Sequence, residues 1–195
     1  MPPRLAQIHD RFDRMGVNEW AAAVPGKCCH NSELTAECYT RVFGLLKRAG
    51  CRRGKATLTD LGAGCGRGIA HAVGCGAFAS ASGIECVPLR VEAGCAALRD
   101  LKLSKRAFME LGSFCDPSFQ ICSPCAFSFD IAFDRPTLQA LALKLNEAAA
   151  CCAFVSFKPP GRWEAAGLRN YSLDQSGRVR TSGEERFTFF IYKKN

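Results

Sequence analysis

Apolar residues recur every three or four positions in two stretches near the start of the chain. This spacing puts them on one face of a helix, and it predicts amphipathic helices over residues 5–15 and from Thr35 to Gly50. Glycine is a typical residue at a helix end, which supports the second boundary. The apolar positions are Leu5, Ile8, Phe12 and Met15 in the first helix, and Cys38, Val42, Leu45 or Leu46 and Ala49 in the second.

From residue 56 onward, short β-favouring runs alternate with helical stretches. Alternating strands and helices predict a parallel sheet with helices on both faces. After residue 170 the pattern changes to two strand-like runs around a short polar turn, which predict a closing antiparallel pair. The predicted strands are 56–60, 80–85, 106–110, 127–133, 151–157, 171–181 and 186–192, and the predicted helices between them are 67–76, 88–101 and 137–149.

A glycine-rich segment, residues 60–68, joins the first of these strands to the following helix. Glycines allow positive φ angles and let a ligand approach backbone N–H groups, and a helix start presents unpaired donors. A dinucleotide-binding loop has a third glycine where this chain has Arg67 and Ile69, which disfavours a nicotinamide or flavin dinucleotide. The sequence therefore predicts a loop for another cofactor, with a plain tight turn as the alternative.

The second predicted strand ends in an acidic residue, Glu85, as the glycine segment begins with one, Asp60. This arrangement resembles the S-adenosylmethionine site of class I methyltransferases, in which the acidic residue after the second strand binds both ribose hydroxyls. Carboxylates suit this role because they accept two hydrogen bonds and donate none. The resemblance implies a Rossmann-like fold and cofactor contacts from Asp60, Gly62, Gly64, Gly66 and Glu85.

Four segments together resemble the Dot-one family, the non-SET histone lysine methyltransferases. They are residues 32–35, the glycine loop with Gly83-Ile84-Glu85, residues 155–159, and residues 187–193. The resemblance runs from about residue 30 to the end of the chain. It implies that a loop containing Glu33 closes over the cofactor, and that Arg67 replaces a glutamine that contacts it.

The same resemblance assigns roles to residues that follow the third and fourth parallel strands. It implies that Phe114 stacks on the adenine and that Ser113 faces its amino group. Asp134 would orient the target amine beside Phe133, and Trp163 and Phe157 are further candidate walls of an aromatic channel. Asp134 precedes a predicted helix, so a helix N-cap is the alternative role for it.

The composition fits one compact domain, because 48% of the 195 residues are hydrophobic. Residues 1–50 are predicted to pack on the core, 51–195, and to close the cofactor site. The first residues lack the apolar region of a signal peptide, and no run reaches the roughly 18 to 20 apolar residues of a membrane span. An intracellular protein is expected.

The thirteen cysteines are interpreted as reduced core residues, and no metal is predicted, although Cys28-Cys29-His30, Cys115, Cys122 and Cys125 are loosely grouped.

The formal net charge of +8 indicates anionic partners such as chromatin or nucleic acid. The resemblance implies a lysine of histone H3 as the substrate, a nuclear location, and nucleosome contact through basic residues that include Arg162, Arg169, Arg178 and Arg180. Residues 47–55 are strongly basic and suit either a localisation signal or a helix end with a linker. Two alternatives remain: an amino-methyltransferase acting on nucleic acid or a small molecule, and a non-catalytic cofactor-binding module.

Overall fold

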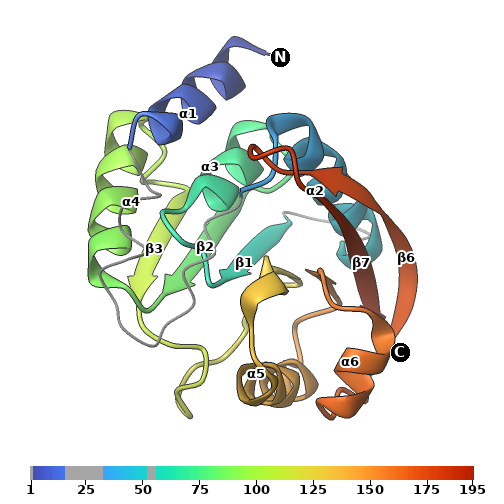
Figure 1. Ribbon diagram of the computed structural model, residues 1–195. Helices are drawn as coiled ribbons and strands as arrows, with labels where there is room; N and C mark the ends of the chain where they lie inside the picture. Colours follow the sequence, from blue (N-terminus) through green and yellow to red (C-terminus); the bar gives the residue numbers. More distant parts are fainter. Residues whose placement is uncertain (1, 16–32, 52–55) are drawn as a thin grey trace.

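The computed structural model describes residues 2–15, 33–51 and 56–195, which form a seven-stranded sheet with helices on both faces (Figure 1). The strand order is β3-β2-β1-β4-β5-β7-β6. The first five strands run parallel, and β7 pairs antiparallel with both β5 and β6. The strands are β1 (Thr57–Leu61), β2 (Ser80–Glu85), β3 (Ala107–Leu111), β4 (Cys125–Phe127), β5 (Ala153–Ser156), β6 (Tyr171–Arg180) and β7 (Arg186–Lys194).

Two hydrophobic cores lie on the two faces of this sheet. The first gathers residues of α1 (Pro3–Asp13), α2 (Ala36–Gly50), α3 (Arg67–Gly74) and α4 (Pro88–Asp100). The second gathers residues of α5 (Arg135–Glu147) and α6 (Pro160–Ala165). Neighbouring strands supply both cores, because successive side chains of a strand point to opposite faces. Phe127 and Val155 belong to the first core, and Ala126 and Phe154 belong to the second.

The two predicted N-terminal helices are present. The hydroxyl of Thr35 accepts a hydrogen bond from Cys38 N, so Thr35 caps α2 as threonine commonly does. Helix α1 packs on α3, and its Leu5, Ile8 and Phe12 are buried. Whether this segment closes a cofactor site stays a prediction. Of the basic stretch 47–55, Lys47 and Arg48 lie in the last turn of α2, and residues 52–55 lie outside the described part of the chain.

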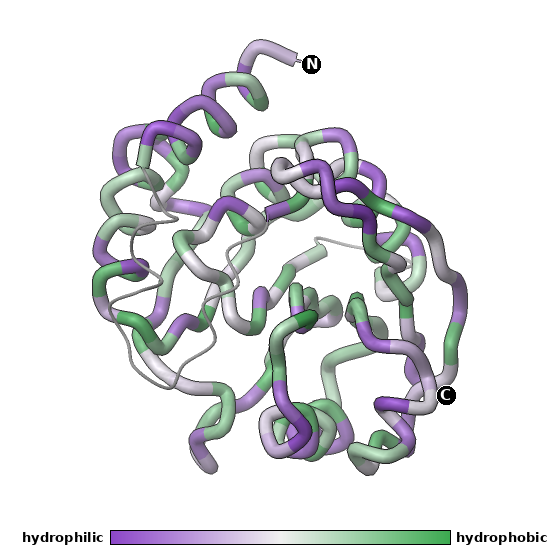
Figure 2. Tube along the Cα trace, in the orientation of Figure 1, coloured by the Kyte–Doolittle hydropathy of each residue, from purple (hydrophilic) through white to green (hydrophobic). Residues whose placement is uncertain are grey.

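The C-terminal antiparallel pair is also present, and it is the longest pairing in the sheet. The edge strand β6 is mostly hydrophilic, and its strongly hydrophobic residues are Leu173 and Val179. The tube at the right of Figure 2 accordingly has only short green stretches. The turn of the hairpin reaches the start of α2, because Leu34 forms an antiparallel bridge with Thr181. Thr35 N donates to Arg180 O at 3.1 Å, and Ser182 N donates to Glu33 O at 2.8 Å. The hairpin is thus joined to the N-terminal segment.

The prediction of a strand over residues 127–133 is wrong. Strand β4 ends at Phe127, and the chain then turns through a short 3₁₀ helix, Asp130–Ala132. The change begins at Ser128, whose hydroxyl donates to Leu61 O at 2.9 Å while its amide still donates to Val155 O of β5 at 3.0 Å. The short helix α6 was not predicted. Among the described residues, no helix is both long and apolar enough to cross a membrane.

Candidate functional site

The carboxyl ends of β1, β2, β3 and β4 meet at one edge of the sheet, and the predicted site residues follow these ends. Ligands of open α/β sheets bind at this edge, near the point where the strand order reverses. Here the order reverses between β1 and β4. We call the region formed by residues 60–68, 85–90, 112–114 and 128–134 the switch-point site.

Three glycines of the loop need their glycine character because each has a positive φ. The angle is 85° at Gly62, 56° at Gly64 and 84° at Gly66. A side chain would strain the backbone at all three positions. The amides of Gly62 and Ala63 both donate to Ile84 O at 3.0 Å, which holds the loop against β2. The alternate-residue spacing of the glycines therefore encodes a specific loop conformation.

A fourth glycine, Gly68, lets the first turn of α3 approach the carboxylate of Asp60. A Cβ atom at Gly68 would lie 2.6 Å from Asp60 Oδ2. Asp60 is 3% exposed at the end of β1. Its burial raises the pKa of this carboxyl well above the usual range, and the negative charges of Glu85 and Glu33 add to the effect. The loop thus surrounds a carboxyl group that is costly to ionise without a partner.

Glu85 ties the loop to the end of β2 through its carboxylate. Its oxygens accept hydrogen bonds from Gly64 N at 3.0 Å, Cys86 N at 3.0 Å and Val87 N at 3.1 Å. Arg90 Nη1 lies 3.9 Å from Oε1. A carboxylate offers about four lone-pair directions. Cys86 Sγ also donates to Oε1, at 3.7 Å, so the direction that is left is on Oε2 beside the Gly64 amide, and a hydroxyl ligand would take it or displace that amide.

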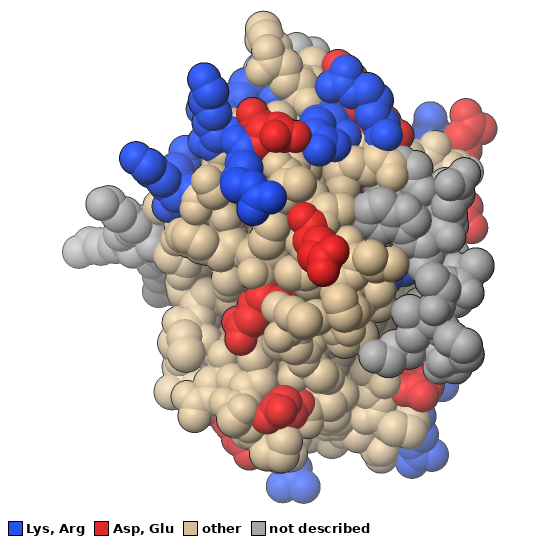
Figure 3. Space-filling view, turned by 90° about the vertical axis from the view of Figure 1, so that its left-hand side faces the viewer, with Lys and Arg blue, Asp and Glu red and all other residues tan. Residues whose placement is uncertain are grey.

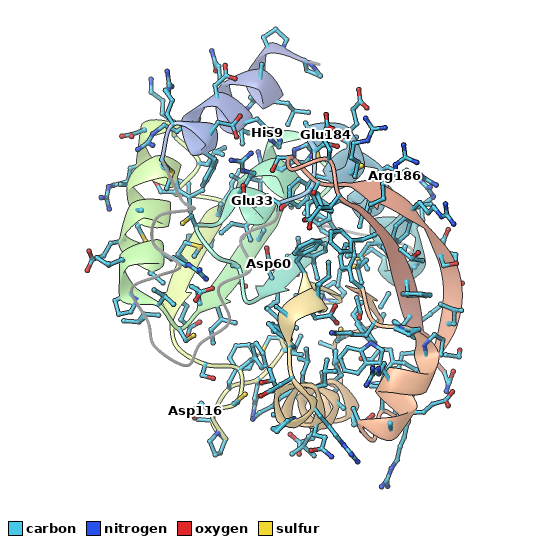
Figure 4. The ribbon with its side chains drawn as sticks, in the orientation of Figure 1. His9, Glu33, Asp60, Asp116, Glu184 and Arg186 are labelled. Atoms are coloured by element: carbon cyan, nitrogen blue, oxygen red, sulfur yellow. The ribbon has the colours of Figure 1, made fainter. Side chains whose placement is uncertain are left out.

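Arg67 forms ion pairs with Glu33 and with Asp13, and its Nη2 lies 2.7 Å from Asp13 Oδ1. Its guanidinium also lies 5.8 Å from the ring centre of Phe12. Burial lowers the pKa of Arg67, but the charges of Glu33 and Asp13 outweigh burial and raise it overall. Burial raises the pKa of Glu33, although Arg67 opposes this shift. Glu33 and Arg67 thus link the N-terminal segment to the start of α3, and Glu33 lies between Asp60 and the hairpin turn in Figure 4.

Phe114 and Phe133 form an aromatic pair beside the glycine loop. Their ring centres are 5.4 Å apart, and Phe114 is 8% exposed. A Cβ atom at Gly62 would lie 3.0 Å from the Phe133 ring, so this ring lies directly on the loop. Ser113 Oγ accepts a hydrogen bond from Cys115 N at 3.1 Å. The structure therefore brings Phe114, Phe133 and Gly62 together.

Asp134 is exposed and caps α5. Its Oδ1 accepts a hydrogen bond from Thr137 N at 2.9 Å. This hydrogen bonding with Thr137 lowers the pKa of Asp134 below its ordinary value, so the side chain is ionised at neutral pH. The N-cap alternative describes this geometry, because the backbone and the side chain of Thr137 both hydrogen-bond to the carboxylate.

Sequence reasoning missed Asp130, a fully buried carboxyl group directly after β4. It accepts hydrogen bonds from Ser156 Oγ and, at 2.7 Å, from Phe157 N. Burial raises the pKa of Asp130 to about 6, although these hydrogen bonds oppose the shift. Lys158 Nζ donates to Ile131 O at 2.6 Å. The missed signal was an aspartate inside an apolar run, because a buried carboxylate requires polar partners.

Two further predictions concerned aromatic walls. Trp163 is not at the switch-point site: it is buried in the second core, and its Nε1 donates to Ser156 Oγ at 2.9 Å. Phe157 packs 4.6 Å from Phe129, the residue that follows β4 by two positions. Phe157 therefore lies near the site, because Phe129 belongs to it.

The cysteine groupings divide between core and surface. Cys115 and Cys122 are exposed, whereas Cys125 is buried with its Sγ 3.6 Å from Cys51 Sγ. Cys28, Cys29 and His30 lie outside the described residues. Within residues 2–15, 33–51 and 56–195 there is no cluster of three or more side chains suited to hold a metal ion.

No protein-family model and no curated protein matches this chain. Solved structures do match. A protein of Pyrococcus horikoshii proposed to be an RNA methyltransferase is 17% identical, with a TM-score of 0.62, 91% of this chain covered and 98% of the other. The Bacillus subtilis m1A22 tRNA methyltransferase TrmK is 11% identical, with a TM-score of 0.62 and coverage of 84% and 68%.

A third match has a small-molecule substrate. It is geranyl diphosphate C-methyltransferase of Streptomyces coelicolor, solved with S-adenosylhomocysteine, geranyl diphosphate and Mg²⁺. It is 11% identical, with a TM-score of 0.59, 80% of this chain covered and 79% of the other. The predicted cofactor is supported, because the bound S-adenosylhomocysteine is the product of S-adenosylmethionine.

These neighbours overturn the resemblance to Dot-one histone methyltransferases. Four of the similar structures, all bacterial or archaeal, are described as tRNA or RNA methyltransferases and not as histone-modifying enzymes. The predicted histone and nucleosome partners are therefore wrong, and the predicted nuclear location loses its basis. The predicted fold is confirmed: the chain has the Rossmann-like fold of class I methyltransferases.

Proposed function

We propose that this chain is an S-adenosylmethionine-dependent methyltransferase that modifies a nitrogen atom of a nucleic-acid base. The observation that carries the proposal is the switch-point site. There, three positive-φ glycines, the buried Asp60 and the loop-bonded Glu85 form the cradle for a nucleoside with a positive sulfonium group. Two carboxyl groups beside one cofactor favour a cation.

In the proposed complex, Glu85 accepts hydrogen bonds from the ribose hydroxyls, and Phe114 stacks on the adenine with Ser113 at its edge. Gly62, Gly64 and Gly66 leave room for the amino-acid part near Asp60. Arg67 and Glu33 support the site without contacting the cofactor. Their ion pair holds the start of α3 against the segment that precedes α2. Asp60 gains a partner for its charge when a cation binds, which offsets the cost of its burial.

S-adenosylmethionine supplies an electrophilic methyl group, and the protein must present a neutral nitrogen lone pair in line with it. Phe133 lies on the glycine loop and forms the apolar wall that excludes water beside the reacting atoms. Asp134 follows it directly, and its exposed carboxylate accepts a hydrogen bond from the target amino group and orients the lone pair. An exposed aspartate is ionised at neutral pH, so Asp134 keeps its charge while it does so.

A base is favoured over other substrates by two observations. The net charge of +8 attracts polyanions, and the solved structures similar to this chain include tRNA methyltransferases. A small anionic substrate is the second candidate, because geranyl diphosphate C-methyltransferase has the same fold. Proteins under 20% identical share a fold without sharing a substrate, so an assay must decide between these candidates.

The decisive assay is transfer of a radiolabelled methyl group, with tRNA, duplex DNA, free histones and geranyl diphosphate offered side by side. We expect label on tRNA. Label on histones or on the diphosphate alone would contradict the proposed substrate. Absence of any S-adenosylhomocysteine binding, measured by calorimetry, would contradict the proposed cofactor as well.

The cofactor assignment is tested by Glu85→Gln. The amide replaces a charged acceptor by a neutral one, and hydrogen bonds to charged groups contribute about 1.5 to 3 kcal/mol, so S-adenosylhomocysteine should bind roughly 10- to 100-fold more weakly. Glu92→Gln is the matched control, because Glu92 is exposed on α4. Equal affinity in the two variants would exclude Glu85 from the cofactor site.

A further inference from the structure

A groove with a volume of about 770 Å³ lies outside the switch-point site, between the start of α2 and the end of the β6–β7 hairpin. Residues 35–38 line one side of it, and Arg178, Val179, Arg180 and Arg186 line the other. We call it the arginine groove. All three arginines are exposed, and Arg186 points outward at the upper right of Figure 4.

The positive charge of this groove is concentrated by the strand register. Arg180 and Arg186 are direct partners across the hairpin, and Arg178 lies two residues before Arg180 on the same face of β6. Like charges directly opposite each other destabilise a strand pair. Within the described part of the chain, no carboxylate forms an ion pair with any of the three guanidinium groups, and Glu37 is the acidic residue of the lining.

Basic residues elsewhere are arranged differently. On the face in Figure 3, Lys and Arg side chains gather at the top, over α1 and the end of α4, with acidic side chains among and below them. Arg11 of α1 pairs there with Asp100 of α4 at 2.9 Å. Such a pair neutralises its own charge. The arginine groove therefore keeps more of its charge available for an outside anion.

The groove is connected to the switch-point site by short contacts. Arg180 O accepts from Thr35 N, and two residues earlier Glu33 pairs with Arg67 at the end of the glycine loop. A second path runs through aromatic rings. Phe187 follows Arg186 and lies 5.8 Å from Phe129, which follows β4 into the site. Both rings are partly buried. A nucleic-acid strand bound in the groove would therefore be able to extend a base toward the switch-point site. Aromatic side chains are the usual surfaces on which such unstacked bases stack.

We propose that the arginine groove binds the phosphodiester backbone of an RNA whose target base enters the switch-point site. Arginine suits this role because its planar guanidinium pairs with two phosphate oxygens at once. The identification of the ligand as RNA rests on the proposed function. The groove itself is a separate surface, outside the cofactor site.

The test compares two triple variants that lose the same charge. The groove variant is Arg178→Gln/Arg180→Gln/Arg186→Gln, and the control is Arg99→Gln/Arg162→Gln/Arg169→Gln. The control residues are exposed and lie on α4 and around α6. Arg169 precedes β6, whose length places it about 30 Å from Arg180. Binding of a fluorescein-labelled, unmodified tRNA transcript is measured by anisotropy at several salt concentrations from about 0.05 to about 0.3 M. The slope of log affinity against log salt then reports how many phosphate contacts are lost, and we expect about three.

We expect the groove variant to bind the transcript about 50-fold more weakly near 0.15 M salt, and the slope of log affinity against log salt to fall by about 2. The control should retain wild-type affinity within about twofold. In the transfer assay the groove variant should show a raised KM for RNA with kcat and S-adenosylhomocysteine affinity unchanged. Circular dichroism melting checks that both variants fold.

Four outcomes would overturn the inference: no binding of the transcript by the wild type, equal weakening in both variants, tighter binding of a duplex DNA of equal length, or tighter binding of an acidic peptide such as polyglutamate. The proposed function fails separately. If the wild type methylates tRNA while the groove variant binds tRNA normally, the proposed role of the groove is wrong and the proposed function stands. If the groove variant alone loses binding while no methyl is transferred, the groove stands and the function is wrong.

Discussion

Single residues at the switch-point site are constrained more by space than by their own chemistry. Gly68 has an ordinary helical position, yet its lack of a side chain is what lets Asp60 lie under the first turn of α3. Gly62 similarly leaves room for the Phe133 ring. The sequence showed the glycines of the loop, but the reason for each one depends on a neighbour from another element. Such pairs become visible only when the strands are assembled.

Gly68→Ala tests this close approach. Its Cβ would meet Asp60 Oδ2 at 2.6 Å, so the helix or the carboxylate must shift, at a cost of about 1 to 3 kcal/mol of unfolding free energy. Gly161→Ala is the control, because it lies in α6 with no atom within 4 Å of the added group. It should be neutral or slightly stabilising. Equal urea midpoints for the two variants would show that the loop relaxes freely around Asp60.

At the scale of elements, the N-terminal helix is held by polar contacts as well as by its apolar face. His9 of α1 and His71 of α3 form a buried hydrogen bond of 2.9 Å, and His71 also bonds to Thr40 of α2 at 2.9 Å. Asp13 adds an ion pair with Arg67. Three helices thus meet around one imidazole, and its protonation state affects all of them.

This contact predicts a specific loss of stability in acid. Burial, followed by the charge of His9, lowers the pKa of His71 to about 3, against about 6.5 when unfolded. As pH falls below the unfolded value, the unfolded chain takes up the proton first, so the free energy of unfolding decreases by about 2 kcal/mol at pH 5.

The contribution of Asp130 to the free energy of unfolding changes with pH in the opposite direction. Because burial raises its pKa to about 6, the folded protein loses stability as pH rises through that value. The measurement therefore compares wild type with His71→Gln by urea unfolding at pH 7 and pH 5, so that the contribution of Asp130 cancels. The stability difference between the two proteins should shrink by about 2 kcal/mol at the lower pH. A difference that does not change with pH would contradict a neutral, buried His71.

At the scale of the whole molecule, periodicity was enough to predict the sheet, because helices and strands with one clear apolar face have few other ways to pack. The misassigned strand 127–133 shows the limit. Its apolar residues suit a long strand, but they also suit a strand that ends at Phe127 and is followed by a buried Asp130. Only the contacts of Ser128 with Leu61 and of Asp130 with Ser156 distinguish the two arrangements. The glycine loop and Glu85 were recognisable from spacing. The arginine groove was not, because its residues come from separate elements and their register.

The bridge between Leu34 and Thr181 gives the two proposed sites one shared piece of backbone. Arg180 lies at one end of it and the Glu33–Arg67 ion pair at the other. Binding free energies are linked reciprocally. If RNA changes the affinity for the cofactor by some factor, the cofactor must change the affinity for RNA by the same factor. Residues 33–35 thus offer a short physical route by which occupancy of either site changes the affinity of the other.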